Sequence, residues 1–476
     1  MGQNSVIVLL GASGNLAAKK LYPALFNLHR RGLLSDKLKI IGFDPTHMRH
    51  DDFVKHMKSC VDQSSPELED HFKAFSERCS YITINQDAGD DSFVELRERM
   101  ESFIERDEAQ NRHFYMALPP SIYVAVSEQL RRNCYSEKGD SQIIIEKPFG
   151  HDLESSVELH KKLEPNWKES EIFRIDHYLG KEMVKNILTL RFGNPMFGAL
   201  WDCNHIDNIQ ISMTEDIGTE GRGGYFDDVG IIRDVMQNHL TQLMALTTME
   251  RPGSFAAEDL RQEKARVLRL VPPLETKHTL AGQFVKSGDG KHPGYKDDDD
   301  VPEDSRCATF CTSVAYVKNA RWEGVPFILK SGKALSESKT EIRIQLKDTT
   351  DAMLKDTNHN QLIIRIQPHE AVRLKMNAKQ PGLGLRTVET ELDLTYKQTV
   401  EDPDIPEAYE ALLLDAFKGD YSESVSEQEL EASWKIFTPL LHELEGNKDI
   451  QPAPYVYGSE GPDGLEDFVA SYQFQK

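Results

Sequence analysis

The ten residues 173–182 bring together side chains that can bind anions and move protons. They read Phe-Arg-Ile-Asp-His-Tyr-Leu-Gly-Lys-Glu, so Asp176, His177, Tyr178 and Lys181 lie close together in the chain. Imidazole, phenol and ammonium groups together supply the hydrogen-bond donors and the positive charge that a phosphate needs. An ordinary charged loop is the alternative, but the density of these groups favours a phosphate-binding segment.

A glycine-containing turn near the N-terminus has a different chemistry. Residues 11–17 read Gly-Ala-Ser-Gly-Asn-Leu-Ala, after the apolar run 5–10 and before a stretch, 16–31, with helical spacing. Glycines let the backbone turn sharply and approach a ligand, and a helix N-terminus attracts phosphate. The pattern therefore predicts a dinucleotide site, although a tight turn without a ligand is possible. Its expected residues are Gly11, Ala12, Ser13, Gly14, Asn15 and Leu16.

The end of the next apolar run, 38–43, should influence which dinucleotide binds. Asp44 follows it directly, and an acid at this place bonds the ribose 2′-hydroxyl of NAD. His47 and Arg49 lie a few residues later and could meet the 2′-phosphate of NADP. On these residues alone, NAD is slightly favoured.

The elements that must position these groups change in character along the chain. In the first third, apolar runs at 5–10, 38–43, 113–118 and 142–145 alternate with helical stretches, which predicts a parallel sheet covered by helices. Later runs at 206–213, 310–317, 341–346 and 361–366 predict further strands, whereas clear helices are fewer, the best being 229–247. We expect an α/β Rossmann dinucleotide-binding domain over 1–177 and a larger α+β domain with a mostly antiparallel sheet over 178–476.

Composition excludes several classes of protein. The 476 residues include 56 Lys and Arg against 78 Asp and Glu, a net charge of −22, which disfavours nucleic acids and anionic membranes as partners. No apolar stretch approaches the ~20 residues of a membrane-spanning helix. The six cysteines form no C-x-x-C pair; we expect Cys307 and Cys311 to be buried thiols, no metal site, and a cytoplasmic setting. The acidic segment 295–300 is predicted to be a surface loop.

Six segments spread from residue 11 to residue 462 carry a family resemblance. They are GASGNLA (11–17), EKPFG (146–150), RIDHYLGKE (174–182), the run 218–239, RWEGVPF (321–327) and PYVYGSEGP (454–462). With them the chain strongly resembles the glucose-6-phosphate dehydrogenase family. The resemblance implies oxidation of C1 of glucose 6-phosphate to 6-phosphogluconolactone with hydride transfer to NADP. This reaction is the first step of the oxidative pentose phosphate pathway, carried out in the cytosol by a homodimer or homotetramer.

The resemblance also implies roles for individual residues. His239 would be the general base, and Asp176 would orient it and stabilise its charged form. Without the resemblance, His239 would be taken for a core residue, because it shares a helical face with Ile232, Met236 and Leu243. The implied substrate-binding residues are Lys147, His177, Tyr178, Lys181, Glu215, Asp234, Lys333 and Gln367, and Lys147 also contacts the cofactor.

Several positions depart from the family pattern. Asp44-Pro45 replaces the usual Ala-Arg, so NADP is ranked first on family grounds, with NAD or dual use as the alternative. Ser338 stands where several members have a second basic residue, and some related enzymes accept unphosphorylated glucose, which is kept as an alternative substrate. Animal members hold a second, structural NADP, but Glu460 replaces an arginine of that site, and we expect no tightly held structural NADP here.

Two further functions compete with this interpretation. A non-catalytic sensor of sugar phosphate or nucleotide could share the fold, but all the acid–base residues are present. Another Rossmann-type sugar oxidoreductase would fit the segment 146–150 but not the segment 174–182.

Overall fold

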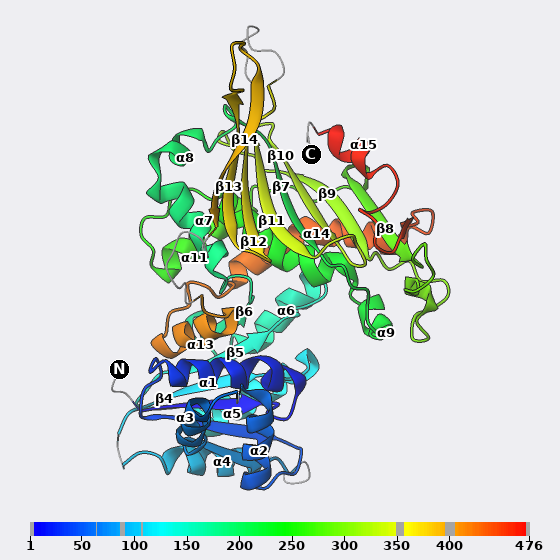
Figure 1. Ribbon diagram of the computed structural model, residues 1–476. Helices are drawn as coiled ribbons and strands as arrows, with labels where there is room; N and C mark the ends of the chain where they lie inside the picture. Colours follow the sequence, from blue (N-terminus) through cyan, green and yellow to red (C-terminus); the bar gives the residue numbers. More distant parts are fainter. Residues whose placement is uncertain are drawn as a thin grey trace.

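The computed structural model describes residues 4–62, 64–85, 91–105, 108–348, 357–395 and 405–472. Figure 1 shows two parts, each built on one β-sheet, with the N-terminal part (blue and cyan) lying below the larger sheet. The first sheet has the strand order β3-β2-β1-β4-β5-β6, and all its neighbouring strands are parallel. This is the order of a Rossmann fold. Its strands are β1 (Asn4–Leu10), β2 (Leu38–Asp44), β3 (Cys79–Thr83), β4 (Gln110–Met116), β5 (Ser141–Glu146) and β6 (Ile172–Ile175).

Helices cover both faces of this first sheet. Along β1, Val6, Val8 and Leu10 pack into one hydrophobic cluster, whereas Ile7 and Leu9 pack into another. Successive side chains of a strand point to opposite faces, so a strand that is apolar throughout must be covered on both. The covering helices are α1 (Tyr22–Arg30), α2 (His50–Cys60), α3 (Pro66–Ser76), α4 (Asp91–Glu101), α5 (Tyr123–Cys134) and α6 (Leu153–Leu163).

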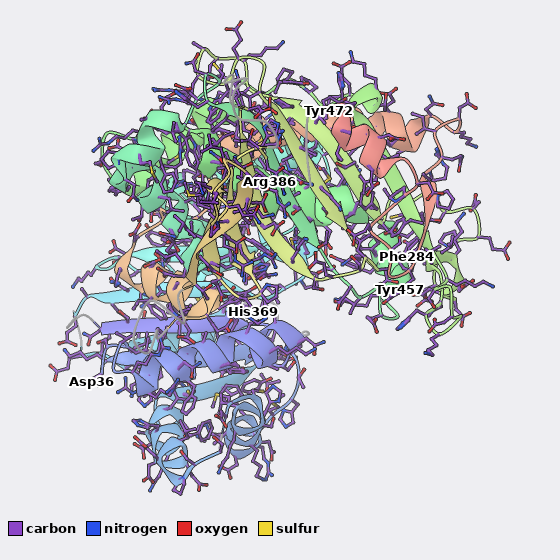
Figure 2. The ribbon with its side chains drawn as sticks, turned by 45° about the horizontal axis from the view of Figure 1, so that its top comes forward. Asp36, Phe284, His369, Arg386, Tyr457 and Tyr472 are labelled. Atoms are coloured by element: carbon purple, nitrogen blue, oxygen red, sulfur yellow. The ribbon has the colours of Figure 1, made fainter. Side chains whose placement is uncertain are left out.

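The second sheet has nine strands in the order β14-β13-β12-β11-β7-β10-β9-β8-β15. Most neighbours are antiparallel, but β7 and β10 at its centre are parallel, as are β8 and β15 at one edge. Figure 2 shows Phe284 of β8 next to Tyr457, which follows β15; their ring centroids are 5.7 Å apart. The strands are β7 (Ile206–Thr214), β8 (Thr279–Val285), β9 (Phe310–Tyr316), β10 (Pro326–Gly332), β11 (Lys339–Leu346), β12 (Gln361–Gln367), β13 (Ala371–Lys379), β14 (Thr387–Thr395) and β15 (Ala453–Val456).

Helices pack on one face of the large sheet, and one of them returns to the first part. In helix α13, the carbonyl of Ala416 accepts a hydrogen bond of 2.7 Å from the Gln142 amide of β5, and Glu410 accepts one of 2.9 Å from Asn27 of α1. The predicted division at residue 177 therefore stays a prediction, because late residues complete the packing of the early ones. The later helices are α7 (Glu182–Gly193), α8 (Pro195–Leu200), α9 (Gly223–Asp227), α10 (Thr241–Thr248), α11 (Ala257–Leu268), α13 (Ala408–Lys418), α14 (Glu427–Gly446) and α15 (Leu465–Ala470).

The predicted fold class is confirmed, and the predicted strands occur with ends shifted by up to three residues. The helix expected over 229–247 is present, but residues 232–240 wind as a π-helix, η5 (Ile232–Leu240), before α10. The expectation that clear helices are fewer in the second part was wrong. Buried polar residues such as Arg261 and Lys264 in α11, and Pro439 within α14, obscure their apolar periodicity.

The expectations for the acidic segment 295–300 and for the two cysteines were each confirmed only in part. Asp299 and Asp300 are exposed as expected, but Tyr295, which begins the same segment, is fully buried. Cys311 is buried, whereas Cys307 is only partly so. Within the described part of the chain, no helix has the length and apolar character needed to cross a membrane.

Candidate active site

The predicted site residues follow the carboxyl ends of strands in both sheets. In open α/β sheets, ligands bind beyond these ends. Because β7 and β10 are parallel neighbours with Thr214 opposite Gly332, the residues that follow them also emerge together. The residues so placed are Gly11 after β1, Asp44 at the end of β2, Lys147 after β5, Asp176 after β6, Glu215 after β7 and Lys333 after β10.

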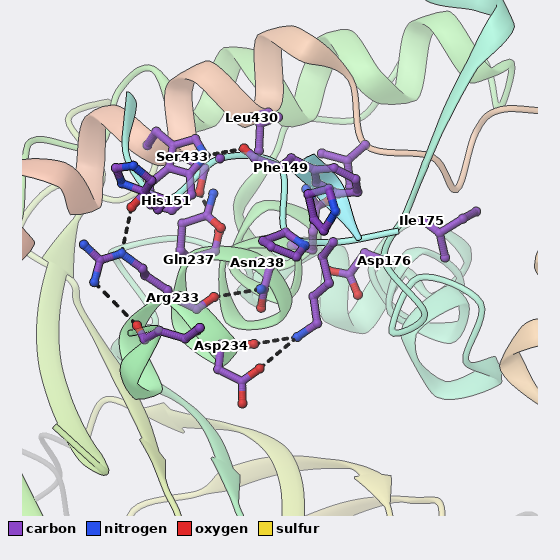
Figure 3. Close-up of a pocket in the computed structure, with 18 of the residues that line it drawn as sticks. Phe149, His151, Ile175, Asp176, Arg233, Asp234, Gln237, Asn238, Leu430 and Ser433 are labelled. Atoms are coloured by element: carbon purple, nitrogen blue, oxygen red, sulfur yellow. Dashed lines mark hydrogen bonds and ion pairs between the residues drawn. The ribbon is translucent and has the colours of Figure 1, made fainter. Parts of the chain in front are cut away.

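The π-helix η5 places Asp234 and His239 together. Residues five apart are bonded neighbours in a π-helix, whereas an α-helix brings residues three or four apart onto one face. Lys147 contacts both residues: its Nζ donates to the Asp234 carbonyl at 2.7 Å and lies 3.3 Å from Asp234 Oδ1 and 3.1 Å from His239 Nε2. Figure 3 marks these bonds at Asp234 with dashed lines.

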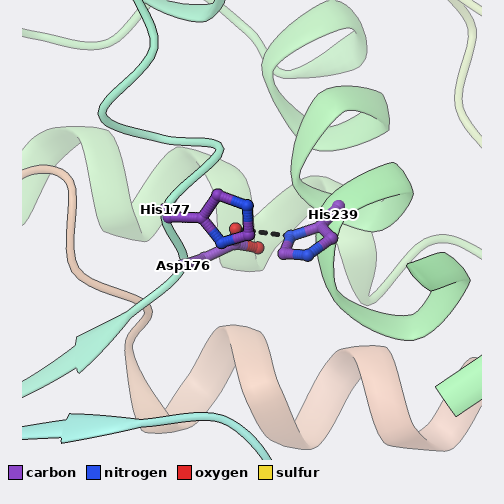
Figure 4. Close-up of side chains that lie close together, drawn as sticks. All are labelled: Asp176, His177 and His239. Carbon is purple, nitrogen blue, oxygen red and sulfur yellow. Dashed lines mark hydrogen bonds and ion pairs between the residues drawn. The ribbon is translucent and has the colours of Figure 1, made fainter. Parts of the chain in front are cut away.

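His239 and Asp176 form a buried dyad. His239 Nδ1 lies 2.6 Å from Asp176 Oδ1, and both side chains are about 2% exposed (Figure 4). Burial, and next the charge of Lys147, lower the pKa of His239, although Asp176 opposes this shift. Burial alone would raise the pKa of Asp176, but His239 holds it well below its usual value. An ionised Asp176 therefore accepts from Nδ1, and the neutral imidazole presents Nε2 as a base.

The segment after Asp176 surrounds the imidazole of His239. The Tyr178 ring stacks on it with centroids 4.4 Å apart, and the His177 ring meets it edge-on at 4.8 Å. Gln367, at the end of β12, donates to the Tyr178 hydroxyl at 3.0 Å, and Lys181 Nζ lies 5.2 Å from the Tyr178 ring. The structure thus brings the predicted phosphate-binding residues together. Burial, followed by the charge of His239, lowers the pKa of His177 to about 3, so this ring is neutral at pH 7.

Acidic and basic side chains alternate in the part of the site next to Lys147. Lys333 forms an ion pair with Glu215, and its Nζ lies 3.8 Å from Asp234 Oδ2. Asp234 in turn contacts Lys147. Burial alone would raise the pKa of Asp234, but the two lysines lower it, so it stays ionised. Alternating donors and acceptors of this kind match the hydroxyl groups of a sugar.

The glycine-containing turn is shaped for a close ligand. Gly11 has a φ of +87°, and a Cβ there would lie 2.3 Å from the Ala117 carbonyl oxygen, so only glycine fits. The Gly14 amide donates to the Gly11 carbonyl at 3.0 Å, which closes the turn before η1 (Ala17–Leu21) begins. The side chain of Asn15 is exposed at this turn. These residues fit a dinucleotide pyrophosphate.

Asp44 is tied to the same turn. Its carboxylate accepts hydrogen bonds from the Ser13 amide at 3.1 Å, the Ser13 hydroxyl at 2.9 Å and the Thr46 amide at 2.8 Å. Burial alone would raise the pKa of Asp44, but the bonds from Thr46 and Ser13 lower it. A fixed negative charge therefore lies at the end of β2. Arg49, the nearest arginine along the chain, is paired with Asp52 and largely exposed.

Asp176, His177 and His239 could in principle hold a metal, because their donor atoms lie within 4.8 Å of one another. Asp176 and His239 already bond each other, and the ammonium group of Lys147 faces the other ring nitrogen of His239, Nε2. A cation beside Lys147 would be repelled, so we assign no metal here.

Three residues near the site were missed by the sequence reasoning. Lys20 lies close enough to Lys181 to lower its pKa, although burial contributes more. Burial raises the pKa of Glu146 to about 7, and this carboxyl accepts a hydrogen bond of 2.5 Å from Tyr115. Tyr409 stacks on His177 with centroids 6.1 Å apart. Glu146 belongs to a quoted motif and could have been singled out, but nothing in the sequence connects Tyr409 to His177.

Lys339, Arg343 and Arg365 correspond to part of the structural NADP site of animal members, but here one acid engages all three. Glu341 is 5% exposed and forms ion pairs with Arg343 and Arg365 at 2.9 Å and a longer one with Lys339 at 3.9 Å. Glu460 accepts a hydrogen bond of 2.6 Å from Ser336. The absence of a tightly held structural NADP stays a prediction.

A Rossmann fold joined to a second sheet domain, with a buried His–Asp base between the end of β6 and η5, is typical of a dinucleotide-dependent oxidoreductase. Family models agree: residues 8–186 match the NAD-binding domain of glucose-6-phosphate dehydrogenase, and residues 188–475 match its C-terminal domain. The chain belongs to the glucose-6-phosphate dehydrogenase family.

Close relatives cover nearly the whole chain. The glucose-6-phosphate 1-dehydrogenase of Emericella nidulans is 57% identical over 472 residues, which are 99% of this chain and 92% of the relative. The Saccharomyces cerevisiae enzyme is 48% identical over 479 residues, covering 99% and 94%. A solved glucose-6-phosphate dehydrogenase in complex with its substrate glucose-6-phosphate superposes with a TM-score of 0.96 at 47% identity, covering 100% of this chain and 99% of that one.

Proposed function

We propose that the protein oxidises C1 of glucose 6-phosphate to 6-phosphoglucono-1,5-lactone, with NADP as the hydride acceptor. The observation that carries this function is the His239–Asp176 dyad, whose imidazole is enclosed by His177 and Tyr178 of the predicted phosphate-binding segment. The relatives named above carry the same activity in their names, and one was solved with this substrate.

His239 does the proton chemistry. Asp176 holds Nδ1–H, which leaves Nε2 to accept the proton of the C1 hydroxyl as the hydride leaves, once the substrate oxygen takes the place of Lys147 against Nε2. The bound coenzyme supplies the nicotinamide that accepts the hydride. Lys147, 3.1 Å from Nε2, lies where it can donate to the sugar oxygen and limit the charge that develops there.

The substrate's two ends are held by different groups. Lys147, Glu215, Asp234 and Lys333 bind the hydroxyl groups of the sugar. The phosphate is held by His177, Tyr178 and Lys181, with Gln367 fixing the tyrosine. Because the phosphate is remote from C1, its binding energy can fix the reacting carbon against the coenzyme.

Dinucleotide choice is the finer part of this proposal. The family match supports a nicotinamide dinucleotide, bound at Gly11–Leu16 and beside Lys147. NADP remains first on family grounds. One observation favours NAD or dual use: the ionised Asp44, fixed by Ser13 and Thr46, would repel a 2′-phosphate and accept from a 2′-hydroxyl.

The ratio of kcat/KM for glucose 6-phosphate over glucose tests the substrate. With NADP, and in parallel with NAD, we expect a ratio far above one, because Lys181 and its neighbours add charge-assisted bonds only for the phosphate. A ratio near or below one would identify a glucose dehydrogenase. The relatives named above are called glucose-6-phosphate 1-dehydrogenases, which does not favour that alternative.

We further propose that residues 1–177 bind the dinucleotide, and that residues 178–476 bind the sugar and form a homodimer or homotetramer. Edge strand β14 supports self-association because Val388, Leu392 and Leu394 are 43%, 59% and 47% exposed. Light scattering after size exclusion would give the oligomer size. A cytosolic location stays a prediction.

A further inference from the structure

A cavity of about 420 Å³ lies away from the dyad, where α7 ends and α8 begins. No group assigned above to the substrate or the coenzyme lines it. Three arginines do so, from separate segments, and one acid accompanies them. The lining includes Arg191, Asn194, Trp201, Glu250, Arg251 and Arg321.

Arg191 is a buried cation without a carboxylate partner. Its side chain is 4% exposed, and its two Nη atoms donate to the carbonyls of Leu246 and Met249, each at 2.6 Å. Its buried Nε has no hydrogen-bond partner among the described residues. Burial, and next the charge of Arg321, lower its pKa to about 9, so it remains charged at neutral pH. The helix dipole at the end of α10 offsets only part of this charge.

The other two arginines leave positive charge at the cavity. Arg321 makes two bonds of 2.8 Å to Glu250, which neutralises one guanidinium. Arg251 is exposed and has no hydrogen bond or ion pair to any described residue. Three guanidinium groups therefore face one carboxylate, in a protein whose net charge is −22.

We propose that this cavity binds a phosphate group, either free or carried on a small ester. Guanidinium groups match the tetrahedral oxygens of phosphate, and the exposed guanidinium of Arg251 can bind an anion in the cavity beside the charge of Arg191. Bringing an anion there also relieves the repulsion between Arg191 and Arg321. A cavity of 420 Å³ has room for more than one phosphate group.

Phosphate binding in this cavity would affect the helix that carries His239. Arg191 caps the last carbonyls of α10, which continues directly from η5, and η5 carries His239. The Trp201 indole donates to the Thr247 carbonyl at 2.8 Å and so joins the cavity wall to the same helix end.

The test is calorimetric titration with inorganic pyrophosphate and, separately, with glycerol 3-phosphate. No glucose 6-phosphate or NADPH is added, because both carry phosphate groups that would compete for the cavity; binding at the cavity is identified as the part of the signal that the Arg251→Glu variant loses. We expect this part to correspond to one saturable site per chain. Whichever of the two probes binds more tightly identifies the source of the phosphate, free or esterified.

Arg251→Glu is the decisive variant, because Arg251 is exposed and its loss leaves the fold intact. We expect its affinity for the better probe to fall at least ~10-fold. Arg266→Ala, at another exposed arginine, should bind as the wild type does. Equal binding by Arg251→Glu and wild type, or no saturable site at all, would overturn the proposal. This comparison holds whatever fills the catalytic site, so it stands apart from the test of the proposed function.

Discussion

We call the residues proposed to bind the sugar the sugar side of the site, and those proposed to bind the coenzyme its coenzyme side; the two are positioned in different ways. On the sugar side, β5, β6, β7, β10, β12 and η5 each contribute a residue, and the dyad is about 2% exposed. On the coenzyme side, we expect the choice between NAD and NADP to depend on one local set of contacts between Ser13, Asp44 and Thr46. Contacts among many elements make the reaction hard to change, whereas one local contact makes coenzyme choice easy to change.

The largest effect should come from substituting His239, at the centre of the sugar side. For His239→Asn we expect kcat to fall by about 10²–10⁴-fold, because asparagine cannot act as a base near neutral pH. Turnover followed by reduced nicotinamide measures the effect, and an unchanged melting temperature controls for folding. Near-normal turnover would remove His239 from the mechanism.

Asp176→Asn tests the other member of the dyad. We expect kcat to fall about 10²-fold or more, because the amide no longer fixes Nδ1–H and the tautomer with a free Nε2. The pH profile adds a second readout. His239 must be neutral to act, and its pKa is below the usual value, so wild-type kcat should fall only at pH below about 6.5.

The Asp176→Asn variant should shift the fall in kcat at low pH, which is the acid limb of the pH profile, in one direction. Asp176 raises the pKa of His239, so its neutral replacement should shift the limb to still lower pH. Measurement of kcat between pH 5 and 8 checks this. A limb that moves to higher pH in Asp176→Asn would contradict the assignment of Asp176 as the ionised partner.

A smaller effect is expected at the phosphate end. For Lys181→Ala, kcat/KM for glucose 6-phosphate should fall by about 10–100-fold, from the loss of one charge-assisted bond, while kcat/KM for glucose stays nearly unchanged. Lys162→Ala, an exposed lysine of α6, is the control. Equal losses for both sugars would place Lys181 outside phosphate recognition.

How well the sequence predicts the site also differs between the coenzyme side and the sugar side. The coenzyme turn could be located because Gly11 and Gly14 act locally between a strand and a helix. The residues proposed to bind the sugar hydroxyls come from four elements, β5, β7, β10 and η5, and could be assembled only through family resemblance, whereas the phosphate-binding segment 173–182 was predicted from its own density of donors. The spacing of Ile232, Met236 and His239 favours an α-helix, and the π-winding that aligns Asp234 with His239 has no local signal.

Long-range packing explains the remaining misses. Tyr409 reaches His177 because α13 returns to the first sheet, where Ala416 meets Gln142. That contact joins residues 274 positions apart. Alternation within one segment cannot reveal such a partner, because it reports which face of an element is apolar and not what lies against it.

The smallest effect, and the sharpest test of the comparison, concerns Asp44. For Asp44→Ala we expect the ratio of kcat/KM for NADP over NAD to rise by about tenfold, because a carboxylate that repels the 2′-phosphate and binds the 2′-hydroxyl is lost. Activity with glucose 6-phosphate and the preferred coenzyme should otherwise stay within about tenfold of wild type.

The matched control is Thr46→Ser, which retains both the backbone amide that donates to Asp44 and the hydroxyl that helps to lower the pKa of Asp44. We expect it to change the coenzyme ratio little. A ratio unchanged in Asp44→Ala would show that coenzyme choice does not depend on this local contact. Sugar binding and coenzyme choice would then both depend on contacts among many elements, and the two sides of the site would not differ in this respect.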